Sequence, residues 1–184
     1  MKIGIIIGST RPERRGAAVG QWVHEIASAR DDAEYELVDL ESFQLELLDE
    51  PIVPGAANRQ YESPQTTAWS KKIDSLDAFV FVTPEYNHGV PAALKNAVDV
   101  IYPEWNNKAI TYVSYGADKG VRAVEQWRTI TANALLHSTR AQVSMSTFDD
   151  WSDGVFDPDA MYVDALNGAL DQLVALAGAV KTLR

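Results

Sequence analysis

The sequence predicts an α/β fold in which a parallel sheet of five strands lies between two layers of helices. Two observations lead to this prediction. Strand-like segments of nearly continuous apolar character alternate with segments whose apolar residues recur at helical spacing. Strands of that character are typical of a parallel sheet whose two faces are both covered. The chain has 184 residues, a length that suits one domain with a large core, so residues 1–184 are expected to form a single domain.

Strand and helix patterns alternate from one end of the chain to the other. Strands are expected at residues 2–7, 35–39, 77–83, 108–114 and 141–145. Helices are expected at residues 16–29, 64–75, 90–101, 120–136 and 159–183. Residues 43–63 contain Pro51, Pro54 and Gly55 and show no periodicity, which predicts a long loop. A loop of that length is expected to lie over a functional site.

The composition restricts the partners of the protein. Its formal net charge is −10, so nucleic acid and anionic membrane surfaces should repel it, and neither is expected as a partner. The absence of cysteine excludes disulfides, thiolate nucleophiles and cysteine-ligated metals, and it fits a cytoplasmic protein. The N-terminus shows no signal-peptide pattern, and no apolar run approaches the ~20 residues that span a bilayer, so an intracellular protein is expected.

The connection after the first strand is the most informative part of the chain. The apolar strand ends at Gly8, a polar loop follows, and a helix pattern begins at Gly16. Backbone N–H groups at a helix N-terminus bind anions, and hydroxyl and guanidinium groups add charge-assisted hydrogen bonds. This loop of an acidic protein holds three arginines within five residues: Arg11, Arg14 and Arg15. These features predict a phosphate site, with a solvated surface loop as the alternative.

The spacing of the glycines restricts the kind of phosphate ligand. Gly4, Gly8 and Gly16 do not form the G-x-G-x-x-G fingerprint of a dinucleotide site, and the chain has no G-x-x-x-x-G-K-[ST] P-loop. A loop of hydroxyls and arginines is more like a cradle for one terminal phosphate, as in flavin mononucleotide (FMN).

Two further polar loops follow the third and fourth expected strands. In a parallel α/β sheet, ligands bind beyond the carboxyl ends of the strands, where these loops meet the phosphate loop. Residues 84–89 offer backbone donors and acceptors to the edge of a flat ring, with Tyr86 as a wall. Gly116 and Gly120 let the backbone of the other loop approach such a ring closely.

Other chemistries find little support in the sequence. The three histidines are scattered without metal-ligand spacing, and no G-x-S-x-G motif indicates a hydrolase, so no metal site is expected. Residues 149–154 do not fit a calcium loop, because Trp151 and Ala160 would occupy ligand positions. A polar loop is expected there, with Asp157 or Asp159 capping the last helix. Trp151 and Phe156 in this loop are expected to cover the site or to pack on a second subunit.

Three motifs in order along the chain match a known family. They are Gly8-Ser9-Thr10-Arg11 with Arg15-Gly16, then Pro84-Glu85-Tyr86-Asn87-His88-Gly89 with Pro91-Ala92-Ala93-Leu94-Lys95-Asn96, and then Ser114-Tyr115-Gly116. With these motifs the chain resembles the NADPH-dependent FMN reductase family of flavodoxin-like proteins, from Met1 to about residue 145. The resemblance implies a flavodoxin-like sheet of order 2-1-3-4-5 and FMN that is bound without a covalent bond.

The resemblance also implies which residues hold the cofactor. The FMN phosphate would contact Ser9, Arg11, Arg15, Gly16 and Ala17. The flavin ring would contact Pro84, Glu85, Tyr86, Asn87, Ser114, Tyr115 and Gly116. Members of the family commonly form dimers or tetramers, so a homodimer or homotetramer is expected.

The implied activity is the transfer of a hydride from NAD(P)H to FMN, followed by transfer of electrons to flavin, quinone, azo or similar small acceptors by a ping-pong mechanism. No catalytic acid or base is assigned, because the cofactor supplies this chemistry. A backbone N–H between Glu85 and His88, together with helix dipoles, would stabilise the reduced ring. The His88 side chain is expected to be passive. Three cations are candidates for binding the 2′-phosphate of NADPH: Arg14, Lys119 and Arg122.

Two other classes of function remain open at this stage. A flavodoxin-type electron carrier would bind FMN without itself oxidising NAD(P)H, and the acidic charge of the chain suits such a carrier. A non-enzymatic flavin or phosphate sensor has no specific support in the sequence.

Overall fold

The computed structural model describes residues 1–184 and contains the expected parallel sheet. Its five strands are β1 (Lys2–Ile7), β2 (Glu34–Asp39), β3 (Ala78–Pro84), β4 (Lys108–Gly116) and β5 (Leu136–Ser146). Their order across the sheet is β2-β1-β3-β4-β5, and every neighbouring pair is parallel. The flavodoxin-like order that the sequence predicted is therefore confirmed.

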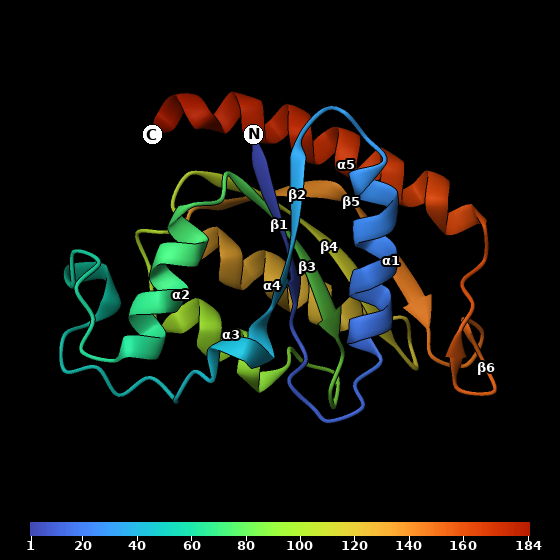
Figure 1. Cartoon of the computed structure of the whole chain (residues 1–184), viewed down its shortest axis with the longest axis horizontal. Coiled ribbons are helices and arrows are strands. Elements are labelled where there is room, and N and C mark those ends of the chain that lie inside the picture. Colours follow the sequence, from blue (N-terminus) through green and yellow to red (C-terminus); the bar gives the residue numbers. More distant parts are fainter.

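Helices cover both faces of this sheet, as Figure 1 shows. They are α1 (Gly16–Ser28), α2 (Pro64–Asp74), α3 (Ala92–Asp99), α4 (Val121–Asn133) and α5 (Met161–Val180). One apolar core lies between the sheet and α1 with α5, and the other lies between the sheet and α2, α3 and α4. Neighbouring residues of β1 point into different cores, Ile5 into the first and Ile6 into the second, as the period of a strand requires.

Three tryptophans anchor the second core, and each has a hydrogen-bond acceptor. Trp69, Trp105 and Trp127 are fully buried. The indole N–H of Trp69 donates to the carbonyl of Ala97 at 2.8 Å. The indole N–H of Trp127 donates to the hydroxyl of Thr83 at 3.0 Å. Because a buried indole N–H without an acceptor is costly, these bonds fix α2 against α3 and α4 against β3.

The edge strand β5 is longer than predicted. It begins at Leu136 instead of residue 141, and α4 correspondingly ends at Asn133. The first part of this strand could not be predicted from the sequence because residues 138–140 are polar. The β4–β5 register also shifts between Ile110 and Tyr112.

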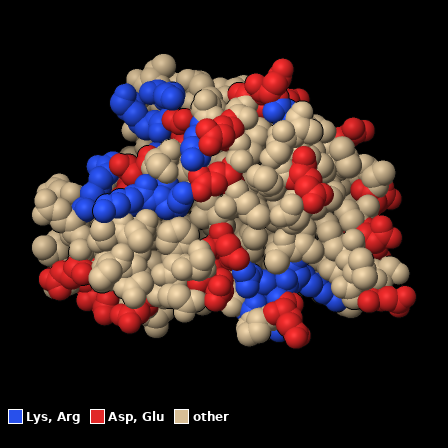
Figure 2. Space-filling view, viewed as in Figure 1, with Lys and Arg blue, Asp and Glu red and all other residues tan.

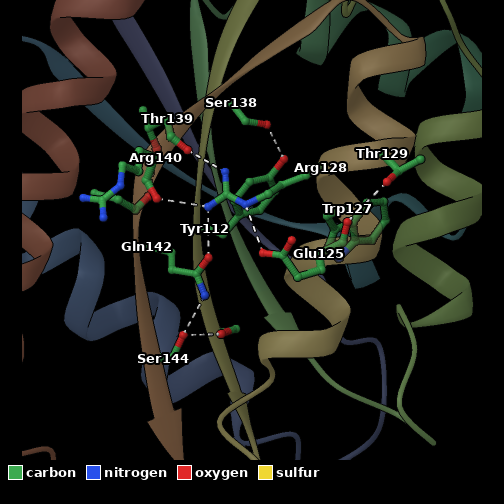
Figure 3. A network of polar contacts seen from close by, with 12 residues as sticks. Tyr112, Glu125, Trp127, Arg128, Thr129, Ser138, Thr139, Arg140, Gln142 and Ser144 are labelled. Carbon is green, nitrogen blue, oxygen red and sulfur yellow. Dashed lines mark hydrogen bonds and ion pairs between the residues drawn. The ribbon is translucent and has the colours of Figure 1, made fainter.

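The Arg128 side chain of α4 explains why polar residues are tolerated in this strand. Its guanidinium donates to the carbonyls of Thr139 at 2.6 Å and Arg140 at 3.1 Å, and to the side chain of Gln142 at 2.9 Å (Figure 3). It also lies 5.4 Å from the centre of the Tyr112 ring. Arg128 therefore satisfies backbone carbonyls that the irregular register leaves without a strand partner.

A short hairpin replaces the polar loop that was expected before the last helix. Its strands are β6 (Trp151–Ser152) and β7 (Val155–Phe156), which pair antiparallel. Asp153 and Gly154 form the two-residue turn with φ values of 49° and 81°. Turns with two positive φ values match the twist of a hairpin, and Asp-Gly favours them. Ala160, and not the expected Asp157 or Asp159, occupies the N-cap position of the last helix, although the Asp159 carboxylate accepts from the N–H of Met161 at 2.8 Å.

The segment between β2 and α2 is mostly irregular, as predicted, apart from the short 3-10 helices Leu40–Phe43 and Pro54–Ala56. Figure 1 shows it running past α3 toward α2. Asn96 of α3 holds it by donating to the carbonyl of Glu46 at 2.7 Å and accepting from the N–H of Leu48 at 3.0 Å.

One segment, Met161–Leu183, is long and apolar enough to cross a membrane, with a mean hydropathy of 1.2. This segment is not a continuous apolar run in the sequence, because Asp164 and Asp171 interrupt it. Within it, the side chains of Leu166, Leu170 and Leu173 are fully buried in the core beside the sheet. A helix that covers the core of a globular domain passes the same test of length and composition.

We predict that Arg128→Met lowers the free energy of unfolding by about 2 kcal/mol, because it leaves the carbonyl of the buried Thr139 without this donor. Urea unfolding followed by circular dichroism measures this. Arg140→Met is the matched control, since that side chain is exposed, and it should change the free energy by less than about 0.5 kcal/mol. Equal effects of the two substitutions would contradict this role of Arg128.

Candidate functional site

The three predicted loops meet at the carboxyl edge of the sheet and enclose a cavity of about 370 Å³. This edge faces the lower side of Figure 1. Eight of the twelve residues predicted to hold the cofactor line the cavity: Ser9, Arg11, Arg15, Pro84, Glu85, Tyr86, Tyr115 and Gly116. The cavity also has four lining residues that were not among them: Glu13, Arg14, Ala117 and Thr147. Its volume is in the range of small-ligand sites.

The loop between β1 and α1 presents backbone N–H groups that have no partner in the protein. The N–H of Gly8 still belongs to the sheet and donates to Val82 at 2.9 Å. The N–H groups of residues 9–11 and 13–16 donate to no protein atom, and neither does that of Ala18. Arg15 occupies the N-cap position of α1, and no side chain caps this helix. The loop and the helix N-terminus therefore form a concentrated source of donors for an anion.

The three arginines of this loop are held by different kinds of partner. The guanidinium carbon of Arg11 lies 5.9 Å from the centre of the Tyr86 ring. Arg15 donates to the carbonyl of Thr147 at 2.8 Å. Arg14 forms an ion pair with Asp39 at the end of β2. Only Arg14 has its charge neutralised by a carboxylate, so Arg11 and Arg15 keep theirs for a ligand. Figure 2 shows the resulting basic patch at the lower edge, where Figure 1 places this loop.

Two tyrosines and two small residues join the phosphate loop to the other loops. The hydroxyl of Ser9, which is almost fully buried, lies 2.8 Å from the hydroxyl of Tyr86. Burial raises the pKa of Tyr115, so this phenol stays neutral near pH 7. A Cβ added to Gly16 would lie 2.5 Å from the Tyr115 hydroxyl. Glycine is therefore required where α1 begins, because Tyr115 passes directly beside it.

The loop after β3 forms a tight turn at its tip. Tyr86 and Gly89 exchange two backbone hydrogen bonds of 3.0 and 2.9 Å. Asn87 and His88 between them have φ values of 50° and 61°. The N–H of Glu85 donates to the carbonyl of Tyr115, so among residues 85–88 only Asn87 and His88 keep a free N–H. The backbone N–H that the sequence analysis expects between Glu85 and His88 must therefore belong to Asn87 or His88.

The side chain of Glu85 points toward α4 and caps it. Its carboxylate accepts from the backbone N–H of Arg122 at 3.0 Å and of Ala123 at 3.3 Å. The positive end of α4 is therefore already neutralised, in contrast to that of α1. Arg122 also donates to Glu85 at 3.1 Å and to Asp118 at 2.7 Å, and the bond to Asp118 lowers the pKa of that carboxylate.

Four predicted residues do not line the cavity. Ser114 is buried, and its hydroxyl donates to the carbonyl of Lys119 at 2.8 Å, which closes the loop after β4. Gly16 lies behind Tyr115, Ala17 is exposed on α1, and Asn87 is exposed at the turn. The backbone N–H groups of Gly16 and Asn87 are still free to bind a ligand, whereas the Ser114 side chain holds the loop after β4 in its conformation.

Some features of the site could not be predicted from the sequence. Arg14 belongs to the arginine cluster, but only the structure shows that it pairs with Asp39 while also lining the cavity. Thr147 belongs to no motif and contributes its backbone carbonyl. Of the cations suggested for the 2′-phosphate of NADPH, Arg14 and Arg122 are paired with carboxylates, and no salt bridge involves Lys119.

The chain is similar in sequence to known FMN reductases and quinone reductases. The sequence model of the NADPH-dependent FMN reductase family matches residues 1–150. An NAD(P)H-dependent FMN reductase of Schizosaccharomyces pombe is 42% identical over 129 residues, which cover 70% of this chain and 64% of that protein. A quinone reductase of Pseudomonas putida is 34% identical over 131 residues, which cover 66% of this chain and 64% of that protein. The chain thus spans less than two thirds of the length of these two relatives.

Solved structures confirm the fold. FerB of Paracoccus denitrificans, a flavoenzyme described as an NAD(P)H:(acceptor) oxidoreductase, superposes with a TM-score of 0.74 at 18% identity and covers 97% of both chains. The resemblance that the three motifs indicated is confirmed by the family match, which extends over most of the chain and includes all three loops. The chain belongs to the NADPH-dependent FMN reductase family.

Proposed function

We propose that the protein is an FMN-dependent oxidoreductase that takes a hydride from NAD(P)H and reduces a small acceptor. The observation that carries this proposal is the row of unpartnered N–H groups between Ser9 and Gly16, at the uncapped N-terminus of α1. This row marks an anion site in a protein whose net charge is −10. The family description names FMN and NADPH, both of which carry phosphate.

The residues of the cavity fit FMN. Its terminal phosphate would accept hydrogen bonds from N–H groups among residues 9–11 and 13–16, and the unneutralised Arg11 and Arg15 would add charge-assisted bonds. Gly16 leaves no side chain in this cradle. When bound, FMN accepts a hydride from NAD(P)H and donates electrons to the acceptor.

The remaining loops would hold the ring and stabilise charge on it. The free N–H groups of Asn87 and His88 are fixed by the Tyr86–Gly89 pairing, so they are oriented before any ligand binds. Preorganised donors of this kind stabilise developing negative charge without reorganisation. The Glu85 carboxylate is committed to α4, so it is not available as a general acid or base.

A ping-pong order is the simplest kinetic scheme for this site. FMN would fill the cavity that the three loops line, so we propose that the donor and the acceptor approach the bound flavin in turn through the opening of this cavity. Quinones, free flavins and azo compounds are planar acceptors that would enter the place the nicotinamide leaves. A quinone receives support from the name of the Pseudomonas putida relative.

The second candidate is a flavodoxin-type electron carrier, which the surface charge favours. Acidic side chains are spread over the face shown in Figure 2. Such a surface suits encounters with basic protein partners. The carrier would share the phosphate cradle with the reductase but would not react with NAD(P)H.

The test is the visible spectrum of the purified protein, followed by additions of NADPH and NADH without oxygen. We expect flavin absorbance that bleaches within seconds with at least one donor, and parallel lines in double-reciprocal plots at several acceptor concentrations. Flavin bands that persist with both donors would favour the electron carrier. A protein that is colourless and takes up no FMN would contradict both candidates.

A second prediction concerns Gly16. The substitution Gly16→Ala should weaken FMN binding by at least about tenfold, because its Cβ would meet the Tyr115 hydroxyl at 2.5 Å and displace either the ring or the helix N-terminus. Fluorescence titration with FMN measures the dissociation constant.

The matched control for this prediction is Gly168→Ala in α5, where nothing lies within 4 Å of the added Cβ. That variant should bind FMN as the natural protein does. Combining Gly16→Ala with Tyr115→Phe should restore part of the affinity, since the nearest remaining ring atom is 3.3 Å away. Full affinity in Gly16→Ala alone would show that the phosphate does not lie against the start of α1.

A further inference from the structure

The β6–β7 hairpin is firmly attached next to the phosphate cradle. Asp150, which directly precedes it, is almost fully buried. Its carboxylate accepts from the backbone N–H of Ser146 at 2.7 Å and from the hydroxyl of Tyr162 at 3.3 Å. The hairpin is therefore bound both to the end of β5 and to α5, and its turn is the favoured Asp-Gly type.

Aromatic contacts fix the orientation of Trp151 in this hairpin. The Trp151 ring lies 4.7 Å from that of Phe156, and Phe156 contacts Trp22 of α1 edge-on at 6.1 Å. On another side, Trp151 lies 6.1 Å from the ring of Tyr115, which borders the cavity. The indole is thus packed between Phe156 of its own hairpin and Tyr115 at the end of β4.

Trp151 in turn holds Arg15. The guanidinium carbon of Arg15 lies 5.0 Å from the centre of the indole ring, and one of its N–H groups donates to the carbonyl of Thr147 at 2.8 Å. An exposed arginine otherwise loses considerable side-chain entropy when it binds a ligand. A ring face orders the guanidinium without neutralising it, whereas the carboxylate of Asp39 neutralises Arg14.

We propose that Trp151 is a positioning residue that holds Arg15 in the phosphate cradle and thereby makes the protein prefer FMN over riboflavin, the same flavin without the phosphate. This inference rests on the proposed function, in that the cradle must bind the FMN phosphate. The hairpin lies beyond residues 1–150, the part that matches the family, so this support for Arg15 is supplied by a segment outside the matched region.

The experiment measures dissociation constants of FMN and riboflavin separately, by calorimetric titration. Trp151→Leu keeps an apolar side chain but removes the ring face, and it should weaken FMN binding about five- to tenfold while changing riboflavin binding less than about twofold. Trp151→Phe keeps a ring and should retain most of the FMN affinity. Val155→Ala is the control on the same hairpin, because Val155 is exposed, and it should bind both flavins normally.

A double-substitution cycle tests whether Trp151 acts through Arg15. In the background of Arg15→Leu, adding Trp151→Leu should cause no further loss of FMN affinity. An equal loss of both flavins in Trp151→Leu would show a merely structural role and overturn the inference, as would an unchanged FMN affinity. Both of these results leave the proposed function standing. If the natural protein binds no FMN, the proposed function fails and this inference fails with it.

Discussion

The uncapped N-terminus of α1 is the feature on which the rest of the site depends. In the sheet order β2-β1-β3, the helix after β1 covers one face of the sheet and the helix after β3 covers the other. The β1–α1 loop therefore lies at the carboxyl edge of the sheet, where ligands bind in such folds. There the N–H groups between Ser9 and Gly16 have no acceptor in the protein, while Glu85 supplies one to α4. An anion is therefore favoured at one helix and excluded from the other, which fixes where a phosphate and an attached ring can lie.

The carboxyl edge of the sheet carries local positive charge, whereas the whole molecule is negatively charged. A protein with a net charge of −10 would repel phosphate unless positive charge were concentrated locally. Arg11 and Arg15 provide that charge and are held by aromatic rings, which order a guanidinium without cancelling it. Arg14 is paired with Asp39 and joins the loop to the end of β2. Adjacent arginines thus differ in what they offer a ligand because their partners differ in charge.

Much of the fold could be predicted from sequence because β1, β3 and β4 are nearly continuous apolar segments. The start of β5 could not, since its polar residues are satisfied by Arg128 from another element. The β6–β7 hairpin has a local signal in the sequence, because Asp153-Gly154 favours a two-residue turn and Trp151 and Phe156 pair across it. At the site, loop positions were predicted well, whereas side-chain directions were not. The Glu85 carboxylate binds α4 and the Ser114 hydroxyl binds the carbonyl of Lys119, and these partners become neighbours only in the folded protein.

The central claim is that the backbone of residues 9–16 receives the phosphate of FMN. Nuclear magnetic resonance of ¹⁵N-labelled protein tests it most directly, by titration with FMN and then with riboflavin. The account predicts large downfield shifts of the amide protons of residues 9–11 and 13–16 with FMN, as these groups gain charge-assisted hydrogen bonds, and much smaller shifts with riboflavin. A protein that binds FMN while these amide signals stay in place would contradict it.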